Sequence, residues 1–126
     1  MPKKQYSVLL VEDDPDQIMI YKTQLEIDGY KFFNCKNYQD LKNILKNNKI
    51  DIILLDILLG DVSGKDILKK LNQEKIVKKI PVVVFSNLKG KGDAKLYQKL
   101  GAKDFWVKTE FVPKDVSRKI KSMIEG

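Results

Sequence analysis

The chain has 126 residues, 43% of them hydrophobic, which is enough for one compact domain over residues 1–126. Its one cysteine, Cys35, excludes an internal disulfide and favours the reducing cytoplasm as its location. Every apolar run is far shorter than the roughly 18 residues of a membrane-spanning helix. We therefore expect a cytoplasmic protein with no membrane partner.

Positive charge is concentrated in the second half of the sequence. Residues 1–64 contain 8 lysines and 10 acidic residues, whereas residues 65–126 contain 16 basic and 7 acidic residues, for a net charge of +7 overall. A basic half indicates an acidic partner or nucleic acid, although a solvated lysine-rich surface has the same composition. Arg118 is the only arginine, and arginine is the side chain that reads guanine bidentately, so we expect no sequence-specific nucleic-acid recognition.

Short apolar runs alternate along the chain with amphipathic stretches, and no repeat or flexible linker interrupts them. The runs at 7–11, 51–55 and 81–85 are apolar without alternation, which is typical of parallel strands covered on both faces. Weaker candidates for strands lie at 30–35 and 104–108. The sequence therefore predicts five strands.

A helix is predicted after each strand. The helical patterns span 15–28, 38–47, 64–74, 91–100 and 112–124. Asp14, Asn37 and Ser63 can cap the first three, and Pro15 and Pro113 suit the first position of a helix. Because repeated right-handed βαβ units build an open parallel sheet with helices on both faces, the predicted fold class is α/β, a doubly wound (βα)5 sheet.

Polar residues end four of the predicted strands. Glu12 and Asp13 follow the first strand, Asp56 follows the third, and Ser86 and Lys108 end the fourth and fifth. In a doubly wound sheet, function gathers beyond the carboxyl ends of the strands. We therefore expect these acids, the hydroxyl and the ammonium group to converge on one edge of the sheet.

These residue types indicate phosphoryl transfer that depends on magnesium. Clustered carboxylates repel one another unless a cation lies among them, and oxygen ligands of this kind suit Mg²⁺. A carboxylate is also a nucleophile toward phosphorus, and positive charge and hydrogen-bond donors stabilise the transferred group. We therefore expect Asp56 to be the nucleophile, Mg²⁺ and Lys108 to supply positive charge, and Ser86 to donate from its hydroxyl.

Four segments together resemble the receiver domain of two-component response regulators, over nearly the whole chain. They are VLLVEDDP, DIILLDILLGDVSG, VVVFSN and GAKDFWVK, in that order and each at a predicted strand end. The resemblance implies a flavodoxin-like, CheY-like sheet with strand order 2-1-3-4-5. It also implies that Asp56 is phosphorylated and that Mg²⁺ is bound by Glu12, Asp13, Asp56 and the backbone carbonyl of Leu58. By the same resemblance, Ser86 and Lys108 are the family's hydroxyl and lysine. Ser86 and Phe105 would form its switch.

For this chain the resemblance implies a stand-alone receiver, which is a phosphoacceptor signalling domain rather than a conventional enzyme. The phosphoryl group would come from a phosphohistidine on a histidine kinase or histidine phosphotransfer protein, because the chain itself contains no histidine. Self-phosphorylation would require Mg²⁺, and autodephosphorylation would be slow because Leu58 and Leu88 offer no polar group to an attacking water. The downstream target would be an acidic protein attracted by the basic face, which we define as residues 91–121.

Three positions depart from the receiver pattern. Thr109 stands where the family usually has proline after its lysine, Gly60 replaces a frequent proline, and Asn87 stands where a small residue usually follows the hydroxyl. These departures predict a different loop after the lysine, a looser loop over 57–64 and narrower access to Asp56. They also motivate an alternative function, that of a degenerate receiver which binds a partner without being phosphorylated.

Overall fold

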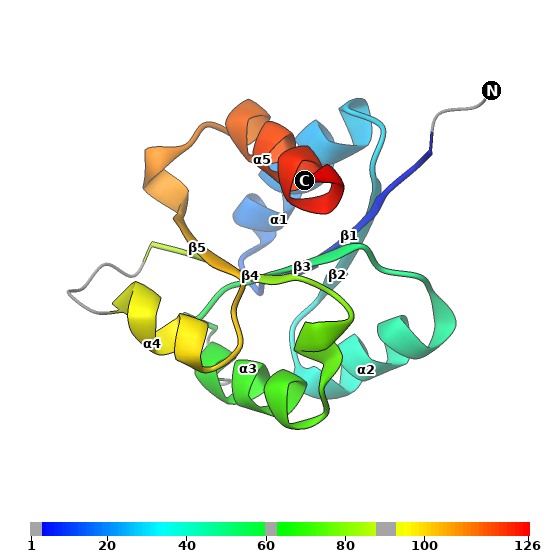
Figure 1. Cartoon of the computed structure of the whole chain (residues 1–126). Helices are drawn as coiled ribbons and strands as arrows, with labels where there is room; N and C mark the ends of the chain where they lie inside the picture. The colour runs from blue at the N-terminus through cyan, green and yellow to red at the C-terminus, as the bar shows by residue number, and fades with distance from the viewer. Residues whose placement is uncertain (1–3, 60–62, 88–92) are drawn as a thin grey trace.

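The computed structural model describes residues 4–59, 63–87 and 93–126, and within them five parallel strands form one sheet (Figure 1). The strand order is β2-β1-β3-β4-β5, which confirms the predicted order. The strands are β1 Ser7–Val11, β2 Lys31–Cys35, β3 Ile52–Leu55, β4 Val82–Ser86 and β5 Asp104–Val107.

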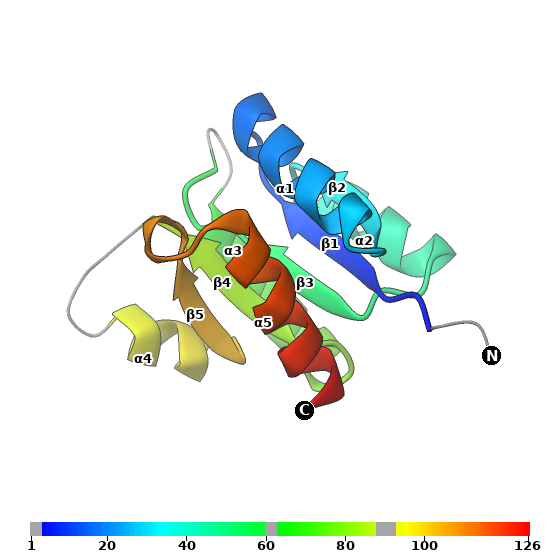
Figure 2. The ribbon, with the colours of Figure 1, turned by 90° about the horizontal axis from the view of Figure 1, so that it is seen from above.

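Helices cover both faces of this sheet. They are α1 Pro15–Ile27, α2 Tyr38–Asn47, α3 Gly64–Gln73, α4 Asp93–Lys99 and α5 Pro113–Glu125. Helices α1 and α5 lie on one face, and α2, α3 and α4 lie on the other (Figure 1, Figure 2). The arrangement is the doubly wound (βα)5 fold, so the predicted fold class is confirmed.

The first three helices begin with the side-chain caps predicted from the sequence. Asp14 accepts hydrogen bonds from the backbone N–H groups of Asp16 and Gln17 at the start of α1. Asn37 caps α2 and Ser63 caps α3, each through one backbone N–H group. These bonds satisfy backbone N–H groups that have no acceptor within the helix, which explains why each helix begins directly after its capping residue.

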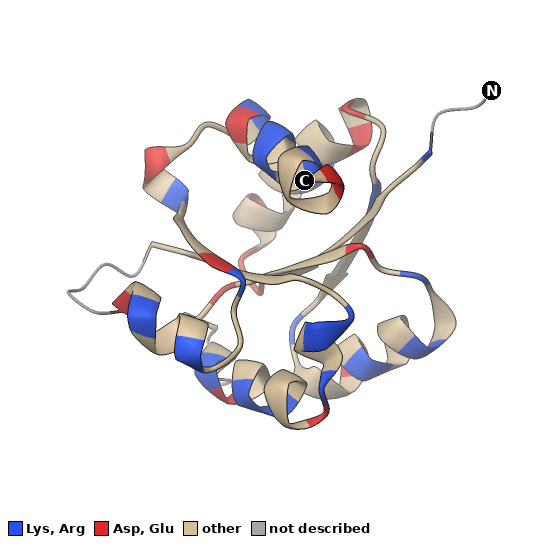
Figure 3. Ribbon diagram, viewed as in Figure 1, with Lys and Arg blue, Asp and Glu red and all other residues tan. Residues whose placement is uncertain are grey.

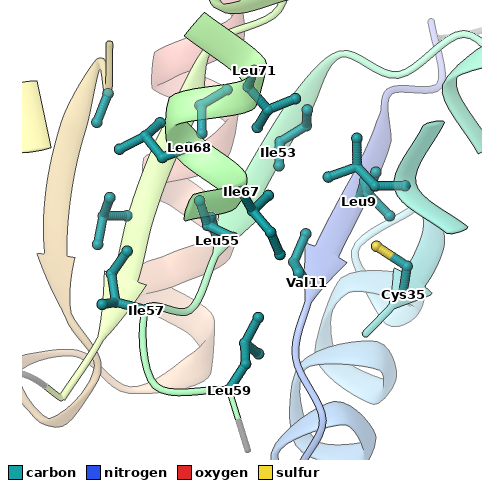
Figure 4. Close-up of a cluster of buried hydrophobic side chains, with 14 of the residues drawn as sticks. Leu9, Val11, Cys35, Ile53, Leu55, Ile57, Leu59, Ile67, Leu68 and Leu71 are labelled. Atoms are coloured by element: carbon teal, nitrogen blue, oxygen red, sulfur yellow. The ribbon is translucent and has the colours of Figure 1, made fainter. Parts of the chain in front are cut away.

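Two apolar clusters hold the helices to the sheet. The cluster beneath α2, α3 and α4 includes Leu9, Val11, Ile53, Leu55, Leu68 and Leu71 (Figure 4). The cluster beneath α1 and α5 includes Val8, Leu10, Ile52, Leu54, Leu25 and Ile120. Successive residues of a strand point to opposite faces, and here both faces are covered. This is why β1 and β3 appear in the sequence as unbroken apolar runs.

Element ends differ from the prediction by one or two residues. β3 begins at Ile52 rather than at residue 51, and β4 extends to Ser86. β5 ends at Val107, so Lys108 lies in the short 3-10 helix η2, Lys108–Glu110, and not in the strand. Of the predicted helix at 91–100, residues 91 and 92 lie outside the described residues.

A second 3-10 helix, η1 Ile76–Lys78, connects α3 to β4 and was not predicted. Its residues are held by local bonds such as that from the Lys79 N–H to the Ile76 carbonyl, and Lys75 before it has a φ of 61°. One-turn helices of this kind have no hydrophobic period that a sequence could reveal. Within the described residues no helix is long and apolar enough to cross a membrane.

Candidate functional site

The carboxyl ends of β1, β3, β4 and β5 bring the predicted site residues together. Val11 pairs with Leu55 across β1 and β3, so Glu12 and Asp56 each lie one residue past a paired position. On the other side of the site, Ser86 pairs with Val107, the residue before Lys108. The convergence predicted from the ends of parallel strands is therefore present in the structure.

Lys108 is the centre of this site and is only 7% exposed. Its Nζ donates a hydrogen bond to Oε1 of Glu12 and another, 3.1 Å long, to Oδ2 of Asp56. The same ammonium group lies 5.5 Å from the centre of the Phe85 ring. Glu12 and Asp56 are themselves 1% and 5% exposed, so Lys108 compensates two buried carboxylates at once.

The two ends of the Glu12–Lys108 pair have shifted pKa values. Burial raises the pKa of Glu12 and the nearby charge of Asp56 raises it further, against the opposing effect of Lys108. Burial alone would lower the pKa of Lys108, but its bonds to Glu12 and the charges of Glu12 and Asp56 outweigh burial and raise it. Lys108 therefore remains a cation at neutral pH.

The Asp56 carboxylate is oriented from two sides. Oδ1 accepts the backbone N–H of Leu58 at 3.0 Å, while Oδ2 is bound by Lys108. The backbone N–H of Asp56 donates to the Val11 carbonyl at 3.1 Å, which continues the β1–β3 ladder past the end of the strands. Asp56 is therefore a buried acid with a fixed side chain and not a loose residue at a strand end.

Gly64 lets the first turn of α3 approach Asp56, a role that the sequence did not reveal. A Cβ at this position would overlap the Asp56 carbonyl oxygen and would lie 2.5 Å from Cα of Ile57. Because atoms essentially never approach so closely, only glycine fits without moving the backbone that carries Asp56. A glycine directly after a capping serine was the only signal available in the sequence.

Asn34 supports the acidic segment after β1 and was also missed. Its side-chain Nδ2 donates to the backbone carbonyls of Leu10 and Glu12, at 2.9 and 3.1 Å. The Glu12 backbone N–H donates to the Cys35 carbonyl, and Oε2 of Glu12 accepts the N–H of Asp13 at 3.0 Å. Asn34 thus fixes the backbone from which Glu12 reaches Lys108. A polar residue near the end of an apolar strand was the available signal.

Asp13 lies half-buried next to Glu12, and the oxygen donors of Glu12, Asp13 and Asp56 are of the type and charge that Mg²⁺ prefers. In residues 4–59, 63–87 and 93–126, however, no three acidic, histidine or cysteine side chains are gathered closely enough to hold a metal ion. Instead Lys108 occupies the position between Glu12 and Asp56. The donor chemistry thus fits magnesium, although the side chains are arranged around an ammonium group.

The remaining predicted site residues differ in burial. Ser86 is fully buried at the end of β4, and Leu58, two residues after Asp56, is 58% exposed. Phe105 is half-buried and stacks on Tyr97 of α4, with 5.7 Å between the ring centres. Trp106 points to the opposite face and is buried in the cluster beneath α5. Gly60 and Leu88 lie outside the described residues.

This combination of a five-stranded doubly wound sheet with two acids and a lysine at its carboxyl edge defines a CheY-like architecture. The family model described as the response regulator receiver domain matches residues 8–121. The chain therefore belongs to the response regulator receiver domain family.

The comparison with individual proteins agrees with the family. Response regulator SaeR of Staphylococcus aureus (strain USA300) is 31% identical over 117 residues, which cover 93% of this chain and 50% of SaeR. The chain thus spans about half the length of the curated relatives it matches.

Solved structures share the fold. The receiver domain of a Francisella response regulator superposes with a TM-score of 0.84 at 21% identity, covering 96% of this chain and 98% of that one. A CheY-like receiver domain protein from Methanospirillum hungatei JF-1 gives a TM-score of 0.82 at 21% identity, with coverage of 97% and 95%.

Proposed function

We propose that residues 1–126 act as one receiver that accepts a phosphoryl group on Asp56 and signals through protein contacts that depend on phosphorylation. The observation that carries this proposal is the buried Asp56 carboxylate, held by the Leu58 N–H at 3.0 Å and by the Lys108 ammonium at 3.1 Å. An acid with a fixed side chain beside a protonated lysine suits attack on phosphorus.

The proposed donor is a phosphohistidine of a histidine kinase or histidine phosphotransfer protein. An Asp56 carboxylate oxygen attacks phosphorus, and the new P–O bond forms as the P–N bond to the partner's imidazole breaks. The imidazole leaves with the bonding electrons and takes up a proton, while Lys108 offsets the negative charge on the phosphoryl oxygens. The chain contains no histidine of its own, which supports an external donor.

Mg²⁺ is the proposed cofactor, held by Glu12, Asp13, Asp56 and the backbone carbonyl of Leu58. When bound, it would supply further positive charge beside the phosphoryl oxygens. The support for this site is the type of its donors, since carboxylate and carbonyl oxygens are the ligands that Mg²⁺ prefers. Glu12 and Asp56 are buried, so a cation beside them stabilises their ionised forms.

The proposed switch consists of Ser86 and Phe105. Ser86 ends β4 beside Val107, and its hydroxyl would donate to the phosphoryl group once this is on Asp56. Phe105 is in the next strand and stacks on Tyr97, so a change in its packing would be transmitted to α4. Signalling by this route would reach the surface of α4.

The proposed contact with a downstream partner uses the basic face, residues 91–121. Lys95, Lys99 and Lys103 are exposed there, whereas Lys114 is paired with Asp28 at 2.9 Å and Arg118 is close to Asp115. Lys91 lies outside the described residues. Figure 3 shows that lysines also line α2 and α3, so positive charge is not confined to the basic face.

Salt dependence tests this contact, because the Debye length falls from about 10 Å at 0.1 M salt to about 3 Å at 1 M. Association with the partner should weaken at high salt and on charge reversal at Lys95 and Lys99. Indifference to both changes would exclude electrostatic attraction by this face.

Labelling with radioactive acetyl phosphate in the presence of Mg²⁺ tests the phosphorylation itself. The wild-type chain should take up label and the Asp56→Asn variant should not, because an amide is not a competent nucleophile. Asp66→Asn is the matched control, since Asp66 is an exposed acid in the first turn of α3. Uptake by Asp56→Asn at the wild-type level would overturn the assignment. No uptake by the wild-type chain would favour the degenerate receiver instead.

A further inference from the structure

A hydrogen bond links two of the residues that depart from the receiver pattern. Oδ1 of Asn87 accepts the backbone N–H of Thr109 at 3.0 Å. Asn87 directly follows β4, and Thr109 is the second residue of η2. A proline at position 109 would have no N–H to donate, so this bond requires another residue there.

The bond lies where the ladder between β4 and β5 has ended. Ser86 and Val107 form the last registered pair, and the Asn87 side chain then reaches one residue further along the neighbouring strand. It satisfies an N–H in the first turn of η2, where a short helix has no internal acceptor. The side-chain bond therefore extends the β4–β5 connection past Lys108.

Lys108 is fixed on both sides by this arrangement. Val107 before it is paired in the sheet, and Thr109 after it is bound by Asn87. The Lys108 side chain must reach from this backbone to Glu12 and Asp56, which belong to β1 and β3. The position of this backbone therefore sets how the side chain reaches both carboxylates.

We propose that Asn87 is a positioning residue, which holds the backbone of Lys108 through Thr109 and so sets the ammonium group against Asp56. This inference rests on the proposed function for its effect on phosphorylation, but not for its effect on the position of Lys108. It differs from the expectation that Asn87 narrows access to Asp56. The oxygen of Asn87 is directed to Thr109, so its main role is to accept a bond.

Three substitutions at position 87 separate these two roles. Asn87→Leu keeps the size and branching but removes the acceptor, Asn87→Ala removes both, and Asn87→Asp keeps an acceptor. Thr109→Ala serves as the matched control, because it keeps the backbone N–H. Asn87 and Thr109 are both exposed, so all four variants should fold.

Amide hydrogen exchange of Thr109 measures the bond directly. Exchange should become roughly tenfold faster in the Leu and Ala variants, which corresponds to about 1.4 kcal/mol and is of the size expected for one hydrogen bond. Protection should be retained in Asn87→Asp and in Thr109→Ala. Unchanged exchange in Asn87→Leu would show that the bond does not exist in solution and would overturn the proposal.

The NMR resonance of the Lys108 ε-methylene group measures positioning, because it senses the nearby Glu12, Asp56 and Phe85. It should move in the Leu and Ala variants and stay in place in Asn87→Asp and Thr109→Ala. If Thr109 exchange changes while this resonance does not, the bond is local and Asn87 does not position Lys108.

Labelling by acetyl phosphate then measures the chemical consequence. The rate of labelling should fall roughly tenfold in both Asn87→Leu and Asn87→Ala. If Asn87 merely narrowed access to Asp56, the rate would be unchanged in Asn87→Leu and higher in Asn87→Ala. Failure of the wild-type chain to take label would count against the proposed function, and the exchange and resonance data would still decide the role of Asn87.

Discussion

Replacement of Lys108 by methionine removes the cation that two buried carboxylates share. Glu12 and Asp56 are 1% and 5% exposed, and each is bound directly by the Lys108 ammonium group. Methionine preserves most of the volume of the side chain, so the change is mainly electrostatic. The carboxylates would then be left in a site with little access to water.

Removal of one partner from a buried ion pair costs about 3–5 kcal/mol, because the other charge is left uncompensated. We expect a loss of this size in the free energy of unfolding of Lys108→Met at pH 7, which is a large part of the roughly 5–15 kcal/mol that stabilises an ordinary domain. The exposed pair of Lys42 with Glu74 provides the comparison. Lys42→Met should cost less than about 1 kcal/mol, because solvent screens that pair.

The loss in Lys108→Met should depend on pH in a definite direction. The pKa of Glu12 is already above its usual value, and loss of Lys108 raises it further. A carboxyl whose pKa is raised on folding destabilises the folded state once it is ionised in the unfolded chain. That cost is absent below the unfolded pKa of 4.5, grows as pH rises from there toward the folded pKa, and is constant above it. The difference from wild type should therefore be large at pH 7 and small at pH 4.

Urea unfolding at both pH values, followed by the fluorescence of the buried Trp106, measures these differences. Glu12→Gln combined with Lys108→Met should recover part of the loss at pH 7, since one of the two buried charges is then gone. The contrary outcome is that Lys108→Met lowers the free energy of unfolding by less than about 1 kcal/mol at pH 7, or by the same amount at pH 4 and pH 7. Either result would refute the claim that Lys108 compensates these carboxylates.

Three further outcomes follow from the structure. Gly64→Ala should cost about 1–3 kcal/mol in urea unfolding, because its Cβ overlaps the Asp56 carbonyl; an unchanged midpoint would contradict the close approach. The hydrogen bond from Ser117, opposed by burial and aided by Gln24 and Lys114, lowers the pKa of Asp28 from 3.8 to about 2. Asp28→Asn should therefore lose about 1–2 kcal/mol above pH 4, and this loss should vanish as pH falls to about 2; a loss that persists at pH 2 would rule out the ionised carboxylate as its source. Leu58→Asn should speed the loss of label from phosphorylated Asp56 by up to roughly tenfold, because a polar side chain can orient the attacking water; an unchanged rate would exclude that role.

The βα order of this protein follows from local patterns in its sequence. Unbroken apolar runs indicate strands covered on both faces, and Asp14, Asn37 and Ser63 mark the starts of three helices, since capping involves only residues within one turn. Once the strands are parallel, the residues that end them must share one edge. The approximate location of Glu12, Asp56, Ser86 and Lys108 therefore needed no knowledge of tertiary contacts.

Other elements could not be placed in this way, because their residues make contacts through space. Lys108 lies 96 positions from Glu12 and 52 from Asp56 in the sequence, and only the packed sheet brings its ammonium group between them. The side chain of Asn34 in β2 likewise donates to the backbone carbonyl of Glu12 after β1, at a separation of 22 positions in the sequence. Sequence periodicity reports which face a residue occupies, not which atoms it reaches.

The positions that depart from the receiver pattern illustrate the same division. The sequence alone marks Thr109 and Asn87 as separate deviations, each with its own expected effect on the site. The fold brings β4 and β5 side by side, and the Asn87 oxygen then accepts the Thr109 N–H. Local chemistry selects the strands and the helix starts, whereas partners for side-chain donors and acceptors are decided by strand register, because a shift of one residue would pair different groups.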